Sequence, residues 1–304
     1  MLAALSASAW IFCTIAASAA QTARNATQRD LVRALGPAGA THVRFLFSLP
    51  FIGALFAVQT LALGLTPPDM SWKTIAWIAA GGGSQALATG LMLAAMRERS
   101  FVVITAYTKI EPVVIAVLGA AFLGETMGPA SLAAVFVATA GVVLISWPAR
   151  GAAHSGAALG WKPALLGLSG GVLFALSATS YRGALLDMGE ASAMMKATSA
   201  LVVGQSIQCA LILAWLATFD RPCIGAIAHD WRRSLFAGLM GALASQLWLM
   251  AFSLANAAAV RTLALIEVPM AQIFTRRVFK QGASLREYFG MALILGGIVL
   301  LLNG

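Results

Sequence analysis

The sequence predicts an all-α integral membrane protein of ten transmembrane helices, arranged as two inverted five-helix repeats. Three observations lead to this prediction: the composition, the number of apolar segments, and a pattern common to both halves. Of the 304 residues, 60% are hydrophobic and 10% are charged, and the mean hydropathy is +0.85. A soluble domain carries about 25% charged residues, so this chain cannot cover a water-facing surface. A lipid bilayer is therefore its expected surrounding.

Ten apolar segments are long enough to cross a membrane, which takes about 20 residues in a helix. A secretory signal peptide carries a Lys or Arg before its apolar run, and the first segment has neither. We therefore expect it to remain as the first helix. Five segments precede the polar, small-residue stretch PARGAAHSGAALG and five follow it. The segments are 2–22, 37–63, 72–96, 101–123, 128–147, 161–181, 191–219, 234–255, 257–279 and 285–302.

The two halves share a pattern that indicates duplication. The stretch KIEPVVIAVLGAAFLGE aligns with LIEVPMAQIFTRRVFKQ, which places Glu111 opposite Glu267 and Pro112 close to Pro269. AGVVLI near the end of the first half aligns with GGIVLL near the end of the second. Because each half holds an odd number of spans, the second must enter the membrane from the opposite side. We therefore predict a repeat over 1–147, a linker over 148–160 and an inverted repeat over 161–304, an architecture common in secondary transporters.

The charge distribution bears on orientation and partners. The net charge is +9, yet the basic residues are scattered between apolar runs and form no patch, so nucleic acid is not an expected partner. They concentrate after the odd-numbered spans, and the positive-inside rule then places these loops in the cytoplasm and both termini outside. The oligomeric state cannot be read from this pattern.

Neither a cofactor nor a metal site is expected. The three cysteines and three histidines are far apart and show no metal-ligand spacing. The 11 acidic residues form no cluster of the kind a membrane enzyme needs, so the chain is not expected to be an enzyme. A membrane scaffold without transport activity would not need ionisable residues inside duplicated spans.

Glu111 and Glu267 are the leading candidates for coupling or substrate binding. An ionisable residue inside a span costs about 2.5–3.5 kcal/mol and usually faces the protein interior. Pro112 and Pro269 predict kinks beside the two glutamates, because proline removes a backbone donor. Either glutamate could take up a proton or hold a cationic group; the alternative is a structural ion pair with a base on another helix.

Arg44 and Lys196 occupy matching places in the two halves and would suit a carboxylate or phosphate on a substrate. The alternative is an ion pair between helices, or a side chain that extends to the membrane interface. Lys109 lies two residues from Glu111, so the two point to different faces of a helix and are not expected to pair.

Further candidates are polar or aromatic. Tyr107 lies four residues before Glu111 and shares its helical face. Gln85 and Gln246 lie in comparable places of the third and eighth spans, and Trp248 could form an aromatic wall. Each has an alternative in hydrogen bonding between helices or in packing.

The residues quoted above resemble the drug/metabolite transporter superfamily, and within it the EamA-type bacterial transporters. RNA at 24–26, VRFLFSLPF at 43–51 and the glycine-rich fifth and tenth spans add to the resemblance. It implies a carrier in the bacterial inner membrane that moves small metabolites, such as amino acids or amphipathic compounds, by alternating access. It favours export over uptake, with a proton or solute gradient as the energy source. Two departures stand out: Gln281 replaces the usual acidic residue, and the family's termini are cytoplasmic.

Overall fold

The described part of the molecule is helical. The computed structural model describes residues 2–98, 104, 107–146, 161–269 and 285–303, and within these ranges no strand occurs. Six helical stretches among them are long and apolar enough to span a membrane, and two shorter apolar helices cover 111–123 and 129–145. The prediction of a helical, membrane-type protein is confirmed. The predicted linker, 148–160, lies outside the described residues.

The first two predicted spans form one nearly continuous helical stretch. It comprises α1 (Leu2–Leu46), α2 (Leu49–Ala57) and the π-helical turn η1 (Val58–Ala62). The apolar part holds 55 residues, about 80 Å at 1.5 Å per residue, which exceeds two thicknesses of the hydrocarbon core. The break between the two passages falls at Gly36, whose φ of 66° suits glycine, directly before Pro37. The predicted loop after residue 22 is therefore wrong, because the first helix continues to the break.

The rest of the first half follows the predicted segments closely. α3 (Trp72–Glu98) is a single long helix. In the fourth segment, a turn at 109–110 is followed by α5 (Glu111–Leu118) and the π-helical turn η2 (Gly119–Leu123). α6 (Pro129–Ser146) completes the half.

The second half contains one helix that the sequence did not predict. The short helix α9 (Arg221–His229) connects the seventh and eighth predicted spans, where only a loop was expected. The ninth segment is described as far as residue 269, and it is broken by a 3₁₀ turn. The elements are α7 (Trp161–Asp187), α8 (Ala193–Phe219), α9, α10 (Trp231–Leu254), α11 (Ala257–Leu263), η4 (Ala264–Ile266) and α13 (Leu285–Asn303).

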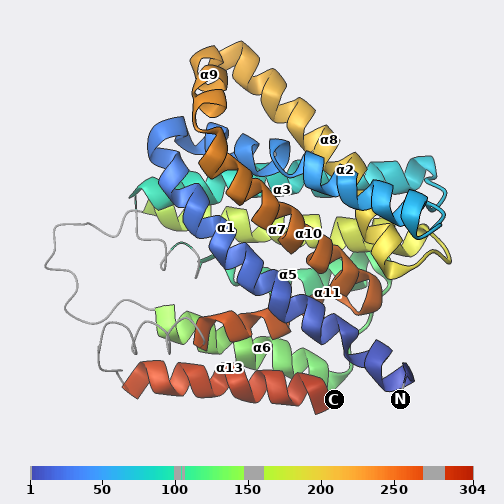
Figure 1. The fold of residues 1–304 in the computed structure, drawn as a ribbon. Coiled ribbons are helices and arrows are strands. Elements are labelled where there is room, and N and C mark those ends of the chain that lie inside the picture. The colour runs from blue at the N-terminus through green and yellow to red at the C-terminus, as the bar shows by residue number, and fades with distance from the viewer. Residues whose placement is uncertain (1, 99–103, 105–106, 147–160, 270–284, 304) are drawn as a thin grey trace, which may run out of the picture.

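The most extensive helix contacts join the two halves. α1 packs along α10, α3 along α7 and α6 along α13. In Figure 1 the α6–α13 pair lies at one side of the bundle, and α8 with α9 at the opposite side. A Cβ on Gly141 of α6 would lie 2.6 Å from the carbonyl oxygen of Gly290 on α13, so this pair depends on residues without side chains.

Candidate functional site

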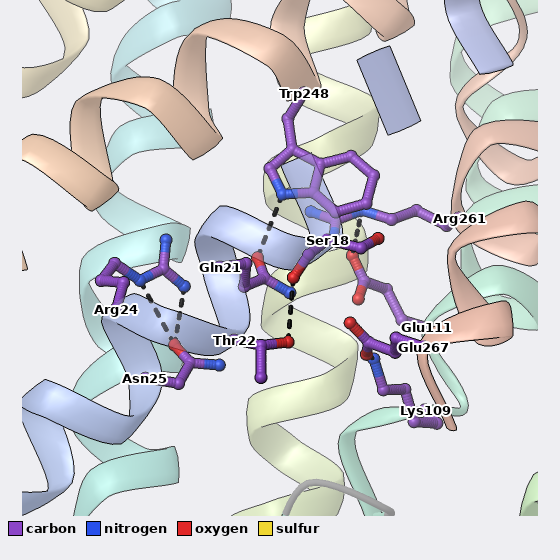
Figure 2. Close-up of polar contacts among 10 residues, drawn as sticks. All are labelled: Ser18, Gln21, Thr22, Arg24, Asn25, Lys109, Glu111, Trp248, Arg261 and Glu267. Atoms are coloured by element: carbon purple, nitrogen blue, oxygen red, sulfur yellow. Dashed lines mark hydrogen bonds and ion pairs between the residues drawn. The ribbon is translucent and has the colours of Figure 1, made fainter. Parts of the chain in front are cut away.

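Two ion pairs connect the halves where the fourth and ninth segments meet (Figure 2). Glu111, the first residue of α5, lies with Oε1 3.0 Å from Nε of Arg261 on α11. Glu267, directly after η4, accepts a hydrogen bond from Nζ of Lys109. These four side chains are only 9% to 16% exposed. Each glutamate is thus neutralised by a base from the other half.

The backbone is interrupted beside both glutamates. Pro112 was predicted to kink a continuous helix; instead it lies in the first turn of α5, where its missing N–H has no intrahelical acceptor to lose. The helix before it ends in the turn at 109–110, which carries Lys109. Glu267 follows the 3₁₀ turn η4, and Pro269 is the last described residue of its segment. Both acids therefore lie at breaks within apolar segments.

Arg261 is held by aromatic rings as well as by charge. Its Cζ lies 4.1 Å from the ring centroid of Trp248 and 5.4 Å from that of Phe252, distances at which a cation is attracted to a ring face. Trp248 is 4% exposed and donates from Nε1 to Oε1 of Gln21 at 3.1 Å. The Nε and Oε1 atoms of the Arg261–Glu111 contact lack aligned hydrogen-bond geometry, so this pair is held by Coulomb attraction.

Two further arginines of α1 are almost fully buried. Arg24 is 2% exposed and donates from Nη2 to Oδ1 of Asn25 at 2.8 Å. Arg44 is 3% exposed and donates from Nη1 to Oγ1 of Thr89 at 3.0 Å. Arg24 was expected among the basic residues of the first loop, and this assignment is wrong because the helix extends past it. Its sequence position between an apolar run and a polar one gave no signal of burial.

The other residue proposed to match Arg44 lies in a different setting. Lys196 is in the first turn of α8 and is half-buried, whereas Arg44 lies deep inside the bundle. The structure therefore does not bring these two bases into equivalent surroundings.

The two glutamines form hydrogen bonds between helices. Oε1 of Gln85 on α3 accepts from Nε2 of Gln208 on α8 at 3.0 Å. Gln246 on α10 accepts from Oγ1 of Thr198 at 3.2 Å and donates to the carbonyl of Met194 at 3.1 Å, both on α8. These contacts agree with the alternative that Gln85 and Gln246 form hydrogen bonds between helices.

Tyr107 packs against α7. A Cβ on Gly167 would lie 2.7 Å from the Cβ of Tyr107, so the glycine leaves the space that the tyrosine fills. The turn at 109–110 separates Tyr107 from α5, and the helical face it was expected to share with Glu111 does not form.

A separate polar cluster lies at one end of the fourth segment. Glu125 binds Arg182 of α7 through two contacts, of 2.7 Å to Nη2 and 2.8 Å to Nε. Asn256, which caps α11, donates from Nδ2 to the second carboxylate oxygen at 2.8 Å. Gln281, which matches Glu125 in the other half, lies outside the described residues.

The first half of the chain matches a known protein family. Residues 4–147 match the EamA-like transporter family. Over these residues the chain is similar to the EamA-like transporters. The resemblance to the EamA-type transporters of the drug/metabolite transporter superfamily, which the sequence indicated, is confirmed over residues 4–147. EamA-like proteins are membrane transporters, which agrees with the apolar helices of a multi-pass membrane protein.

The EamA-like chain also resembles solved structures. A crystal structure described only as that of a protein matches it with a TM-score of 0.68 at 16% sequence identity, covering 98% of each chain. At this identity the likeness concerns the fold alone. No curated protein matches the chain.

Proposed function

We propose that this EamA-like protein is a secondary carrier that exports small metabolites, such as amino acids or amphipathic compounds, across the bacterial inner membrane. Its two halves, 1–147 and 161–304, are inverted five-helix repeats joined by the linker 148–160, and they rock against each other. The observation that carries the proposal is the pair of reciprocal ion pairs, Glu111 with Arg261 and Glu267 with Lys109, which tie one half to the other.

The helix contacts support the inverted repeat. If the two halves are superposed in chain order, α1 corresponds to α7 and α3 to α10. The close contact of α1 with α10 then has its equivalent in the contact of α7 with α3, and α6 with α13 is equivalent to itself. This exchange is expected from a two-fold axis between the halves. With an even number of spans both termini lie on one side of the membrane, and in Figure 1 the start of α1 and the end of α13 lie at the same end of the bundle.

The interrupted helices support a transport site at the repeat interface. In many carriers, discontinuous helices meet near the middle of the membrane and bind the solute or coupling ion there. The breaks before α5 and after η4 bring two carboxylates and two bases together at such a junction. Protonation of Glu111 or Glu267 would remove one negative charge and release Arg261 or Lys109 from the opposite half. The proton is thus the candidate coupling ion.

The test is transport in proteoliposomes with a panel of amino acids and small metabolites, with and without a proton gradient. We expect gradient-driven movement that is lost in Glu111→Gln and Glu267→Gln. The exposed Glu190→Gln variant removes the same charge elsewhere and should behave as the native chain. Because one unpaired buried charge can unfold a protein, the double variants Glu111→Gln/Arg261→Gln and Lys109→Gln/Glu267→Gln provide folded controls.

The outcomes separate the alternatives. Movement that ignores the gradient would reduce the glutamates to a structural role and leave facilitated diffusion or exchange. Gradient-driven accumulation in the opposite direction would indicate uptake instead of export. A panel without any movement by the folded protein would favour a non-transporting membrane scaffold.

A further inference from the structure

Arg24 and Arg44 bring more positive charge into the bundle than the nearby carboxylates neutralise. Their side chains are neighbours, because atoms of both lie within 3.5 Å of the point where a Cβ on Gly241 would sit. Arg24 also interacts electrostatically with Arg44, Arg261 and Glu267, so both arginines belong to the surroundings of the ion pairs. Arg261 and Lys109 each form an ion pair with a glutamate, whereas none of the ion pairs between described residues includes Arg24 or Arg44.

Both arginines keep a nitrogen without a partner inside the protein. Within the described residues, Nη1 of Arg24 and Nε of Arg44 are buried and make no hydrogen bond. Neutral oxygens of Asn25 and Thr89 satisfy part of each guanidinium but carry no compensating charge. A water molecule could satisfy the free N–H groups, but it would leave the two positive charges in place.

Two unneutralised charges in an apolar bundle are costly. Removing one partner of a buried ion pair is strongly destabilising because it leaves a charge without its counter-charge, and Arg24 and Arg44 are two buried charges without an ion-pair partner. Apolar residues of similar size would stabilise the same positions. The cost is compensated if an anion occupies the site in part of the working cycle.

We propose that Arg24 and Arg44 bind the anionic group of the transported solute, and that the solute carries two negative charges, as a dicarboxylate or a phosphate monoester does. This inference rests on the proposed carrier function and names its substrate class. The guanidinium group suits both chemistries, because its planar N–H groups match two oxygens of a carboxylate or phosphate. The ion pairs beside it stay neutral, so a dianion brings the whole cluster to zero net charge.

Binding is tested by thermal unfolding of the purified full chain in detergent. The probes are succinate and succinamide, which share a carbon skeleton, and inorganic phosphate against chloride at equal ionic strength. We expect succinate or phosphate to raise the unfolding temperature while succinamide and chloride do not. A response to succinate only would indicate a carboxylate site, and a response to phosphate only a phosphate site.

The variants Arg24→Gln and Arg44→Gln locate the effect. Losing one charge-assisted contact should weaken anion binding by about 10- to 100-fold. Arg33→Gln removes an exposed arginine from the same helix and should respond as the native chain, which also corrects for general salt effects on stability. Without anion, Arg24→Gln and Arg44→Gln should unfold no earlier than the native chain, because each removes an unneutralised charge. If either arginine served only to stabilise the fold, its Gln variant would unfold at a lower temperature than the native chain.

Either of two results overturns the inference. One is an equal response of the native chain to succinate and succinamide together with no effect of phosphate beyond chloride; this result needs no variant to fold. The other is an unchanged anion response in Arg24→Gln and Arg44→Gln. Anion binding without transport would support this inference and contradict the carrier function. Transport of neutral or cationic solutes alone would support the carrier function and contradict this inference.

Discussion

Glu111 and Lys109 lie two residues apart, yet each finds its partner on a different part of the other half. Glu111 meets Arg261, and Lys109 meets Glu267. Their separation follows from the break between them, because Lys109 lies in the turn at 109–110 and Glu111 is the first residue of α5. Trp248 adds a second restraint by placing its ring against the guanidinium of Arg261. The charges inside the bundle are therefore held in place from several sides.

The Glu111→Gln substitution should destabilise the protein by about 3 kcal/mol, because it leaves the buried Arg261 without its counter-charge. Adding Arg261→Gln should recover much of the loss. The measurement is thermal or denaturant unfolding of both variants in the same detergent. Equal stability of Glu111→Gln and the native chain would show that the pair contributes nothing to folding.

Trp248 offers a graded test of the aromatic contact. Trp248→Phe keeps a ring beside Arg261 but loses the hydrogen bond to Gln21, which should cost about 1 kcal/mol. Trp248→Leu also loses the cation–π contact and should cost about 2 kcal/mol more. Unfolding temperatures of the two variants check this order; a leucine variant as stable as the phenylalanine variant would argue against the ring's role.

Among the elements, the α6–α13 pair shows how small residues set the distance between helices. The predicted glycine-rich fifth and tenth spans meet directly, with Gly141 facing Gly290. A similar approach occurs at α7, where Gly171 lies against the backbone of Thr108. Helices in lipid associate largely through such close van der Waals contact. Spans of this kind can be recognised from their glycines, but their partners cannot.

Gly297 and Gly296 of α13 form a matched pair for testing this contact. A Cβ on Gly297 would lie 2.8 Å from both the N and the Cβ of Ala138, whereas one on Gly296 would meet nothing within 4 Å. We expect Gly297→Ala to push α6 and α13 apart and to lower the unfolding temperature. Gly296→Ala should be neutral or stabilising, by up to about 1 kcal/mol from helix propensity. Identical behaviour of the two variants would contradict the packing described.

Other elements show where sequence reasoning stops. The ranges of α3, α6, α8 and α13 agree with the apolar segments to within a few residues, because segment length and hydropathy are local properties. α9 was not foreseen, since nine residues of mixed polarity are too short to give a periodic signal. Arg24 was misplaced for a similar reason. The apolar run predicts a helix end at residue 22, but the helix continues through polar residues to Gly36.

On the scale of the whole molecule, the two halves are interleaved more than they are separate. The helix pairs with the largest contacts each take one member from each half. The ion pairs and the Glu125–Arg182 cluster cross the same boundary. The halves therefore depend on each other for burial of their charges and of their small-residue faces.

This arrangement predicts that the halves stay together without a covalent link. A protease site inserted within 148–160 should be cleavable without separating the fragments, which should co-elute on size exclusion in mild detergent. Denaturing gels of the same fractions verify that cleavage is complete. Fragments that elute separately would show that the contacts between halves are too weak to hold the bundle.

The sequence by itself determined the membrane class, most of the helical segments, the family and the candidate glutamates, because hydropathy, length and short motifs are written along the chain. Only the tertiary structure decided which charges meet. Lys109 and Glu267 are 158 positions apart, and the sequence around neither residue predicts the rotation and depth at which the fourth and ninth segments pack. The same holds for Arg24 and Arg44, whose burial depends on α10 covering α1. Periodicity places a residue on a face of its own helix, whereas packing of whole helices selects the partner opposite that face.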